Sequence, residues 1–342
     1  MKPAAKRLGT LDRYLTLWIF AAMAVGIALG HFVPGLPAAL QRASSGTTHV
    51  PLAVGLIAML VPPFAKVEYA LLPGVLRNTR LLGLSLFLNW VVGPLLMFGL
   101  AALFLSDHPD CFSGLVLIGL ARCIAMVLVW NDLAEGNREY GAALVALNSL
   151  FQVFAYPFYA WFFMTQLPAW LGLESVAMDL PVAMVAESVL LYLGLPFVLG
   201  AAIRWWGRRT WGAEAFERRI LPRLGRVTPV ALLFTIGVMF SLKGEALLAL
   251  PGDVLRMAVP LVIYFATMFA IGFFLAKSLG TSYDRSAAVA FTAAGNNFEL
   301  AIAVAVGVFG LGSGQALAGV IGPLIEVPTL LLLVQVARRW SW

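Results

Sequence analysis

The feature that most constrains this chain is a series of ten apolar runs, most of them about 20 residues long and separated by short polar connections. A helix of that length and composition crosses the hydrocarbon core of a bilayer. The runs cover residues 14–32, 50–65, 81–105, 111–131, 140–164, 182–203, 227–247, 255–277, 286–308 and 315–336. Two consecutive prolines, Pro62 and Pro63, should end the second run early, because proline lacks the N–H that a helix needs.

Composition supports the same conclusion. Hydrophobic residues make up 61% of the 342 residues and charged residues only 12%, whereas a soluble globular protein carries about 25% charged residues. This excludes a soluble enzyme, a disordered chain and a small disulfide-rich domain. The sequence therefore predicts an all-α polytopic membrane protein with ten transmembrane helices.

The basic residues predict how the chain is oriented. They gather on alternate connections, with the largest group between Arg204 and Arg226, and the opposite connections carry only Arg42, Lys243 and Arg256. Because short loops rich in Lys and Arg remain in the cytosol, we expect a multi-pass protein of the cell membrane with both termini cytosolic. The net charge of +6 then reflects topology and contact with anionic membrane lipids, and nucleic acid is not an expected partner.

The ten runs divide into two sets of five, and adding one constant to the residue numbers of the first set aligns it with the second. The offset places Arg122 on Asn296, Gln152 on Glu326 and Gly26 on Gly200. Because five is odd, the second set must cross the membrane in the opposite sense. We predict a first five-helix repeat (1–165), an external linker (166–181) and a second, inverted repeat (182–342). Such repeats, with interrupted helices at matching places, are typical of secondary transporters, whose sites lie near the membrane midplane.

Run four carries a charged residue and a thiol where both are costly. Arg122 cannot lose its proton, so it must face water, a carboxylate or unbonded carbonyls. Arg122 either forms a structural contact that holds two helices together or influences the neighbouring site electrostatically through its positive charge. Cys123 is either a small buried apolar residue or, with its thiolate favoured by Arg122, a soft ligand for a thiophilic substrate.

Run nine contains Gly295, Asn296 and Asn297, a sequence that favours a turn at the centre of the span. The half-helix ends of an interrupted span expose backbone groups that can meet a polar ligand. Glu299 follows within one turn and is the strongest candidate for a carboxyl group that exchanges protons. The alternative is a neutral, hydrogen-bonded Glu299 that stabilises packing.

Run ten places Glu326 between two prolines, which bend the helix and release carbonyl groups. Glu326 is either a second proton site or a structural brace. Its counterpart under the offset, Gln152, lies in run five close to Asn148 and Ser149, and we expect these three residues to support the site.

Motifs for metal and cofactor chemistry are absent from the sequence. The three histidines are scattered, and there is no H-E-x-x-H, G-x-S-x-G or P-loop pattern. We therefore expect no catalytic residue, no structural metal and no cofactor. An intramembrane enzyme would depend on Glu299 and Glu326 as a carboxylate pair, and protease signatures are missing from the spans.

Five segments resemble the Acr-type arsenical-resistance exporters, within the bile-acid/arsenite/riboflavin transporter superfamily. They are ARCIAMVLVWND (121–132), ALNSLFQ (146–152), AGNNFELA (294–301), SGQAL (313–317) and GPLIEVP (322–328). By this resemblance, the family's essential cysteine matches Cys123 and its essential glutamate matches Glu299. The family fold packs spans three, four, five, eight, nine and ten as a core with crossing broken helices four and nine. Spans one, two, six and seven form a panel that moves against it.

The resemblance implies a secondary exporter of trivalent arsenic that confers arsenic resistance by exchanging arsenite for protons, with antimonite as a second candidate substrate. Arsenic(III) would bind at Cys123, with Arg122, Asn296, Asn297 and Glu299 around it, and protons would be carried by Glu299 and Glu326. The alternative is a sodium-coupled importer of organic anions with the same fold, in which Arg122 holds a carboxylate and Cys123 has no role. The sequence does not predict an oligomeric state.

Overall fold

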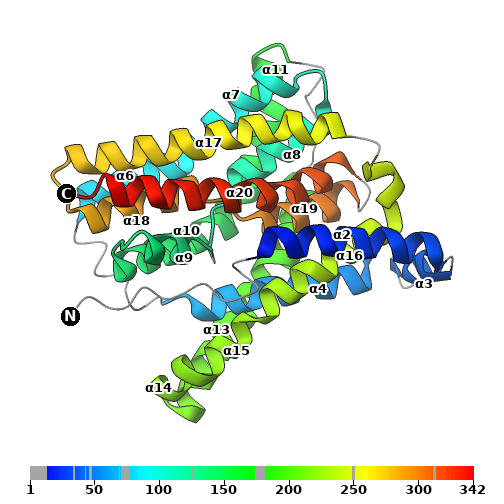
Figure 1. Ribbon diagram of the computed structural model, residues 1–342, viewed down its shortest axis with the longest axis horizontal. Helices are drawn as coiled ribbons and strands as arrows, with labels where there is room; N and C mark the ends of the chain where they lie inside the picture. Colours follow the sequence, from blue (N-terminus) through cyan, green and yellow to red (C-terminus); the bar gives the residue numbers. More distant parts are fainter. Residues whose placement is uncertain are drawn as a thin grey trace.

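The computed structural model describes residues 14–33, 35–42, 44–45, 48–68, 70, 78–124, 126–173, 182–248, 251–310 and 313–342, and these residues are almost entirely helical (Figure 1). The elements of the first half are α2 (Leu15–Phe32), α3 (Gly35–Arg42), α4 (Val50–Lys66), α6 (Thr79–Phe87), η2 (Leu88–Val92), α7 (Gly93–Leu105), α8 (Pro109–Leu120), α9 (Met126–Leu133), α10 (Arg138–Trp161), η3 (Phe162–Gln166) and α11 (Leu167–Trp170). Two short strands, β1 (Ser44–Ser45) and β2 (Thr48–His49), pair antiparallel between α3 and α4.

The elements of the second half are α12 (Val182–Val189), η4 (Leu190–Gly194), α13 (Leu195–Trp211), α14 (Ala213–Ala215), η5 (Phe216–Ile220), α15 (Leu221–Gly225), α16 (Val227–Leu248), α17 (Pro251–Ser278), α18 (Tyr283–Ala294), α19 (Phe298–Phe309) and α20 (Gly314–Arg339). The η elements are single π-helical turns inside longer helices. Residues 174–181 of the predicted linker and residues 1–13 at the N-terminus lie outside the described residues.

Within the described part of the chain, six helical segments are long and apolar enough to cross a membrane, which confirms an all-α polytopic membrane protein. They are Thr79–Leu105, Arg138–Trp170, Val182–Trp211, Ala213–Leu242, Val254–Ser278 and Gly314–Arg339. Four shorter apolar helices, Leu17–Phe32, Ala53–Lys66, Pro109–Leu120 and Phe298–Phe309, fall in the remaining predicted runs.

Two of the predicted runs are interrupted near their centres. In run four, α8 ends at Leu120 and α9 begins at Met126; in run nine, α18 ends at Ala294 and α19 begins at Phe298. Both breaks have extended backbone, with φ −88° and ψ 121° at Ala121 and φ −75° and ψ 142° at Gly295. The residues that favour turns in run nine thus coincide with a break.

The predicted early end of run two is wrong. Helix α4 continues through Pro62 and Pro63 to Lys66. A proline at position 63 leaves the carbonyl of Met59 without its helical N–H partner. The hydroxyl of Thr228, in α16, donates a hydrogen bond to that carbonyl at 3.0 Å. A neighbouring helix therefore satisfies the freed backbone group, which is how membrane helices tolerate proline.

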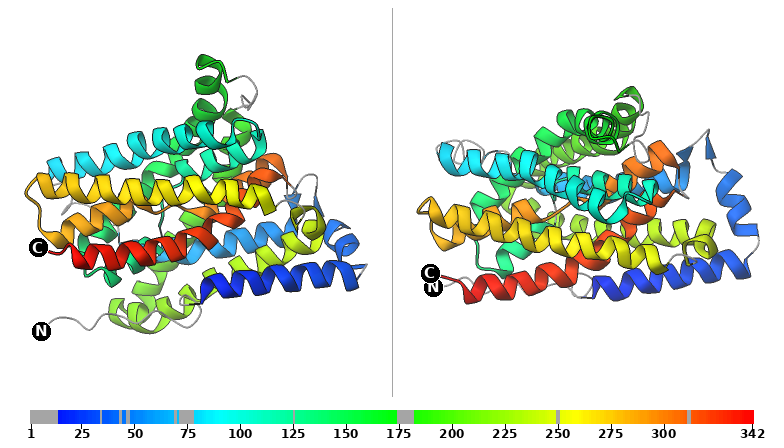
Figure 2. Two further views of the ribbon diagram at one scale, coloured as in Figure 1. Left: turned by 45° about the horizontal axis from the view of Figure 1, so that its top comes forward. Right: turned by 90° about the horizontal axis from the view of Figure 1, so that it is seen from above.

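The helices pack in two groups, which lie one above the other in Figure 1 and in the left view of Figure 2. In the first group, α17 packs against α7, α18 and α20, and α8 packs against α7 and α20. In the second group, α16 packs against α2 and α4, and α4 packs against α13. Close approach of α2 to α16 depends on Gly26 and Gly30, because a Cβ on either would collide with backbone atoms of Gly237 or Ser241. Helix α19 contacts α4 and α12 and so joins the two groups.

The segments that connect the helices carry polar side chains at both ends of the helix bundle. At one end, Asn137 donates from its backbone and side chain to Asp284, both at 2.8 Å, and Arg338 pairs with Glu135 at 3.2 Å. The C-terminus lies at this end in Figure 1. At the opposite end, Arg256 pairs with Asp107 at 2.6 Å. These contacts hold the ends of the broken helices to their neighbours.

Candidate functional site

The two helix breaks cross and bond to each other. The backbone N–H of Cys123 donates to the carbonyl of Gly295 at 3.3 Å, and the N–H of Asn297 donates to the carbonyl of Ala121 at 3.1 Å. Arg122 and Asn296 face each other in this antiparallel bridge. The bridge satisfies backbone groups that the interrupted helices leave unbonded, which the membrane interior requires. Residues that the sequence places in separate spans thereby share one site.

Two side chains from intact helices complete the crossing. The Oε1 atom of Gln152, in α10, accepts a hydrogen bond from the N–H of Arg122 at 3.2 Å. The Oε1 atom of Glu326, in α20, accepts one from the N–H of Asn296 at 3.3 Å. Both side chains are buried. Each break therefore has one of its orphan N–H groups satisfied by a side chain from outside the broken helix.

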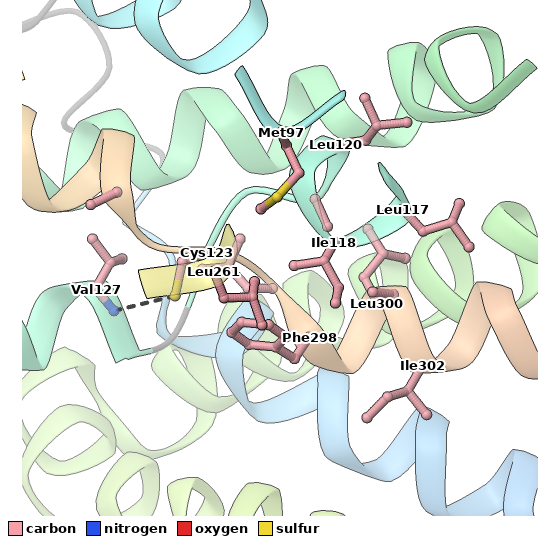
Figure 3. Close-up of a cluster of buried hydrophobic side chains, with 14 of the residues drawn as sticks. Met97, Leu117, Ile118, Leu120, Cys123, Val127, Leu261, Phe298, Leu300 and Ile302 are labelled. Carbon is pink, nitrogen blue, oxygen red and sulfur yellow. Dashed lines mark hydrogen bonds between the residues drawn. The ribbon is translucent and has the colours of Figure 1, made fainter. Parts of the chain in front are cut away.

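Cys123 lies in the first break, just before α9, and 4% of the residue is exposed. Its sulfur accepts a hydrogen bond from the backbone N–H of Val127 at 3.3 Å (Figure 3). Leu261 and Phe298 lie beside it in the same view. The sulfur thus caps the N-terminus of a half-helix, where the helix dipole stabilises negative charge, and it does so inside an otherwise apolar shell. The second cysteine, Cys111, lies in α8 and is also buried; the two are not bonded to each other.

Arg122 is fully buried, and its guanidinium is held by oxygen atoms. It donates to the hydroxyl of Tyr264, in α17, at 2.9 Å and to the carbonyl of Gly119. The space that it occupies depends on Gly93, because a Cβ there would lie 2.9 Å from the guanidinium and 3.0 Å from the Tyr264 hydroxyl. Among the described residues, the ion pairs do not include Arg122. Of the three surroundings that the sequence allows for Arg122, the structure shows a carbonyl oxygen, and the hydroxyl of Tyr264 is an additional partner that the sequence did not predict.

Asn296 and Asn297 have different roles in the break. The amide nitrogen of Asn296 donates to the carbonyls of Ile118 at 2.8 Å and Ala121 at 3.2 Å, which ties the two broken helices together. The Oδ1 atom of Asn297 accepts from the N–H of Leu300 at 3.0 Å and caps α19. Asn297 therefore caps its half-helix as Cys123 caps α9.

The structure brings the remaining predicted residues to the crossing to different degrees. Glu299, in the first turn of α19, is partly exposed and interacts electrostatically with Glu326. Asn148 is buried and accepts a hydrogen bond from the indole N–H of Trp90 at 3.0 Å. Ser149 donates to the carbonyl of Ala146 in its own helix at 2.8 Å.

The sequence reasoning missed Tyr264 and Trp90, which hold Arg122 and Asn148 in place. Each is one aromatic residue in an apolar run, and sequence alone does not distinguish it from a core residue.

The buried atoms without a partner at the crossing are mostly donors. Among the described residues they include Nε of Arg122, Nε2 of Gln152, Nδ2 of Asn148, Nδ2 of Asn297 and, as the one acceptor of this set, Oδ1 of Asn296. The amide orientations of Gln152 and Asn297 follow from the N–H groups that their oxygens accept. Since unpaired buried donors are costly, the site is suited to a small ligand that carries oxygen atoms. Groups of three or more His, Cys, Asp or Glu that could hold a metal ion do not occur among the described residues.

Broken helices that cross at a buried polar site, inside a bundle of apolar helices, define a secondary transporter. Residues 53–250 match the Sodium Bile acid symporter family, and the chain belongs to this family.

Three relatives extend over nearly the whole chain. The arsenical-resistance protein Acr3 of Corynebacterium glutamicum is 48% identical over 339 residues, which cover 99% of this chain and 91% of the relative. Acr3 of Alkaliphilus metalliredigens is 32% identical over 344 residues, which cover 98% of this chain and 94% of the relative. An uncharacterized transporter of Synechocystis is 34% identical over 361 residues, which cover 99% of this chain and 92% of the relative. The resemblance drawn from the motifs is confirmed, and the chain is a transporter, not an enzyme.

Proposed function

We propose that this protein exports trivalent arsenic, as arsenite, from the cytosol across the cell membrane in exchange for protons, and so confers arsenic resistance. The observation that carries the proposal is the thiol of Cys123 in the helix break, beside a bridge to the second break. Two relatives that match nearly the full chain are named arsenical-resistance proteins. Antimonite, which has the same thiol chemistry, is a second candidate substrate.

The thiol supplies the bond to arsenic. Arsenite is mainly a neutral trihydroxide near neutral pH, and sulfur displaces one of its hydroxyl groups. An S–As bond forms, an As–O bond breaks, and the hydroxide leaves as water with the proton of the thiol. A soft thiolate is a better ligand for arsenic than a carboxylate is. One thiol holds arsenic(III) less tightly than three would, so release remains fast enough for transport.

The unpaired donors at the crossing suit the two remaining hydroxyl groups. Nδ2 of Asn297 and Nε2 of Gln152 are buried without a partner, and each can donate to an arsenite oxygen. Arg122 is held by Tyr264 and supplies a fixed positive charge next to Cys123. Asn296 maintains the bridge, so its role is to position the two breaks.

The proton is carried by Glu299, with Glu326 as the second site. The two carboxyl groups interact electrostatically, so a proton on one affects the charge that the other can bear. Glu326 also contacts the break directly through Asn296. Because substrate and proton then meet at one crossing, binding of a proton and binding of arsenite can compete, which couples proton uptake to arsenite release.

The architecture follows from the same proposal. Residues 1–165 and residues 182–342 each form a repeat of five membrane-spanning helices, which gives ten spans in total. The second repeat is inverted relative to the first, and residues 166–181 form the external linker. The matching bonds of Gln152 and Glu326 to the two breaks support this pairing. The group around α17 and α20 acts as the core, and α2, α4, α13 and α16 form the panel that moves against it. Both termini are cytosolic, as the distribution of basic residues indicates.

Uptake of arsenite into everted vesicles tests the proposal, with and without an imposed proton gradient. Uptake should require the protein and rise when the vesicle lumen is acidic. Uptake that is equal to that of vesicles without the protein would contradict arsenite transport, and uptake that is independent of the gradient would contradict proton coupling.

The family name favours one other function, sodium-coupled transport of an organic anion. In that case Arg122 binds the carboxylate of the substrate, and Asn296, Asn297 and Glu326 offer oxygen atoms to sodium. The preponderance of unpaired N–H donors at the crossing disfavours a cation there. Sodium-dependent transport that Cys123→Ser leaves unchanged would support this second function.

A further inference from the structure

The C-terminal turns of α13, together with the connection from α13 to α16, form a basic and aromatic surface that the transport site does not use. Its exposed residues, here called the arginine–tryptophan surface, are Trp205, Trp206, Arg208, Arg209, Trp211, Arg218, Arg219, Arg223 and Arg226. The three indoles are 67%, 69% and 56% exposed. In Figure 1 the α14 and α15 part of this connection projects from the lower edge of the molecule.

The surface has an excess of positive charge. Its two acidic residues are already engaged: Glu214 pairs with Arg218 at 3.2 Å, and Glu217 lies 3.3 Å from Arg204 and 4.0 Å from Arg208. The other four arginines, Arg209, Arg219, Arg223 and Arg226, form no ion pair with a described residue. Four guanidinium groups are therefore open to an external anion.

The surface is built on a fixed base. Arg204 is buried, with one guanidinium nitrogen donating to the carbonyl of Ala65 at 3.1 Å and another to Glu217. Phe216 is fully buried and packs on Gly207, where a Cβ would collide with its ring. These contacts fix the connection to the end of α4. Because the base is already ordered, binding an anion costs little additional conformational entropy.

The aromatic residues decide which anion is expected. The surface lies where the apolar part of α13 ends and before the apolar helix α16 begins, so we place it at the boundary between bilayer and water. Exposed tryptophans at that level sit among lipid headgroups, and the guanidinium of Arg209 already stacks on Trp205, 5.5 Å from the ring centroid. Arginine binds phosphate through two parallel hydrogen bonds. A soluble acidic protein would explain the arginines but not the three exposed indoles.

We propose that the arginine–tryptophan surface binds the phosphate headgroups of anionic phospholipid in the surrounding leaflet. The indoles lie at the level of the acyl–headgroup boundary, and the arginines contact the lipid phosphates. This lipid site is separate from the crossing of the broken helices, so its occupancy does not depend on whether the cargo is arsenite.

Native mass spectrometry of the purified full-length protein tests the proposal. The protein in detergent is titrated with phosphatidylglycerol or with phosphatidylcholine, and the bound lipid is counted. The parent protein should retain phosphatidylglycerol in preference. Arg219→Gln with Arg223→Gln should weaken this binding about tenfold, because two of the four guanidinium groups that are open to lipid phosphate lose their charge.

The matched control replaces two exposed arginines elsewhere, Arg80→Gln with Arg339→Gln, and should bind phosphatidylglycerol as the parent does. Arg219→Lys with Arg223→Lys keeps the charge and should retain most of the binding. Equal binding of the two lipids by the parent would overturn the proposal, as would an equal loss in the control. Displacement of the lipid by millimolar inorganic phosphate would also overturn it, because the surface would then prefer a soluble anion.

Discussion

One side-chain oxygen of Gln152 accepts a hydrogen bond from the N–H of Arg122 at 3.2 Å, and one of Glu326 accepts a hydrogen bond from the N–H of Asn296 at 3.3 Å, so that each of the two residues supports one helix break. The two residues are related by the same offset that relates Arg122 to Asn296. One position holds an amide and the other a carboxyl group. The two breaks thus receive equivalent hydrogen bonds, but of the two side chains only the carboxyl group of Glu326 can take up a proton.

This relationship makes Glu326→Gln a clean test of proton transfer. An amide oxygen can still accept the bond from Asn296, as Gln152 does at its own break, so the fold should be kept. Glu326→Leu, in contrast, should lower the free energy of unfolding by about 1–3 kcal/mol, because it leaves a buried N–H without a partner. Thermal unfolding in detergent measures the difference. If Glu326→Gln also shows unchanged coupling of arsenite uptake to the proton gradient, Glu326 carries no proton.

Cys123→Ser should abolish arsenite binding and efflux, because oxygen replaces the soft sulfur that binds arsenic. The fold should survive, since a hydroxyl can still cap α9 through the N–H of Val127. Arsenite accumulation in an arsenite-sensitive host measures efflux, and equilibrium dialysis of purified protein measures binding. Cys111→Ser is the matched control, because Cys111 is also buried but lies in α8, away from the break. Normal arsenite binding by Cys123→Ser would refute the role assigned to this thiol.

Glu299→Gln should block turnover while some arsenite binding remains, since it imitates the protonated carboxyl and cannot release a proton. Glu299→Asp should keep part of the activity, because a carboxyl group is retained on a shorter side chain. Both variants are compared with the parent by uptake into everted vesicles and by binding to purified protein. Export by Glu299→Gln at the parental rate would move the proton to another group, and Glu326 would be tested next.

Thr228→Val should lower the free energy of unfolding by about 1 kcal/mol or more, because the Met59 carbonyl then lacks both its helical N–H and its hydroxyl donor. Thr228→Ser keeps the donor and serves as the control. Thermal unfolding of the purified variants measures the effect. Equal stability of the Val and Ser variants would mean that another group satisfies the carbonyl.

Asp284, which lies at the same end of the molecule as the C-terminus, should make the free energy of unfolding depend on pH. Burial opposes its ionisation, but hydrogen bonds from Ser282, Asn137 and the backbone of Arg285 outweigh burial and hold its pKa below the usual value. A lowered pKa contributes stability above the unfolded-state pKa, and this contribution is lost as the pH falls through the folded-state value. The stability of the parent relative to Asp284→Asn should therefore be constant near neutral pH and decrease below about pH 4. A difference that does not change with pH would contradict the role of ionised Asp284.

Much of the fold could be predicted from the sequence, because a bilayer imposes simple rules on length and composition. The ten apolar runs coincide with helices, and the turn-forming residues Gly295, Asn296 and Asn297 coincide with a break. The course of α4 through Pro62 and Pro63 could not be predicted, because it depends on a hydroxyl that lies 169 residues away in the chain.

The residues with chemically active side chains can be recognised in the sequence alone, since a thiol, a guanidinium or a carboxyl group inside an apolar run is unusual whatever the packing. The sequence identified Cys123, Arg122, Glu299 and Glu326 on that basis. Which of these residues come into contact, and which partners hold them, depends on how the helices pack. Hydrogen bonds between the breaks, and the contact of Tyr264 with Arg122, join residues that are more than 140 positions apart. Short-range sequence patterns carry no information about such contacts, because they arise when separate helices pack and each buried polar group must find a partner.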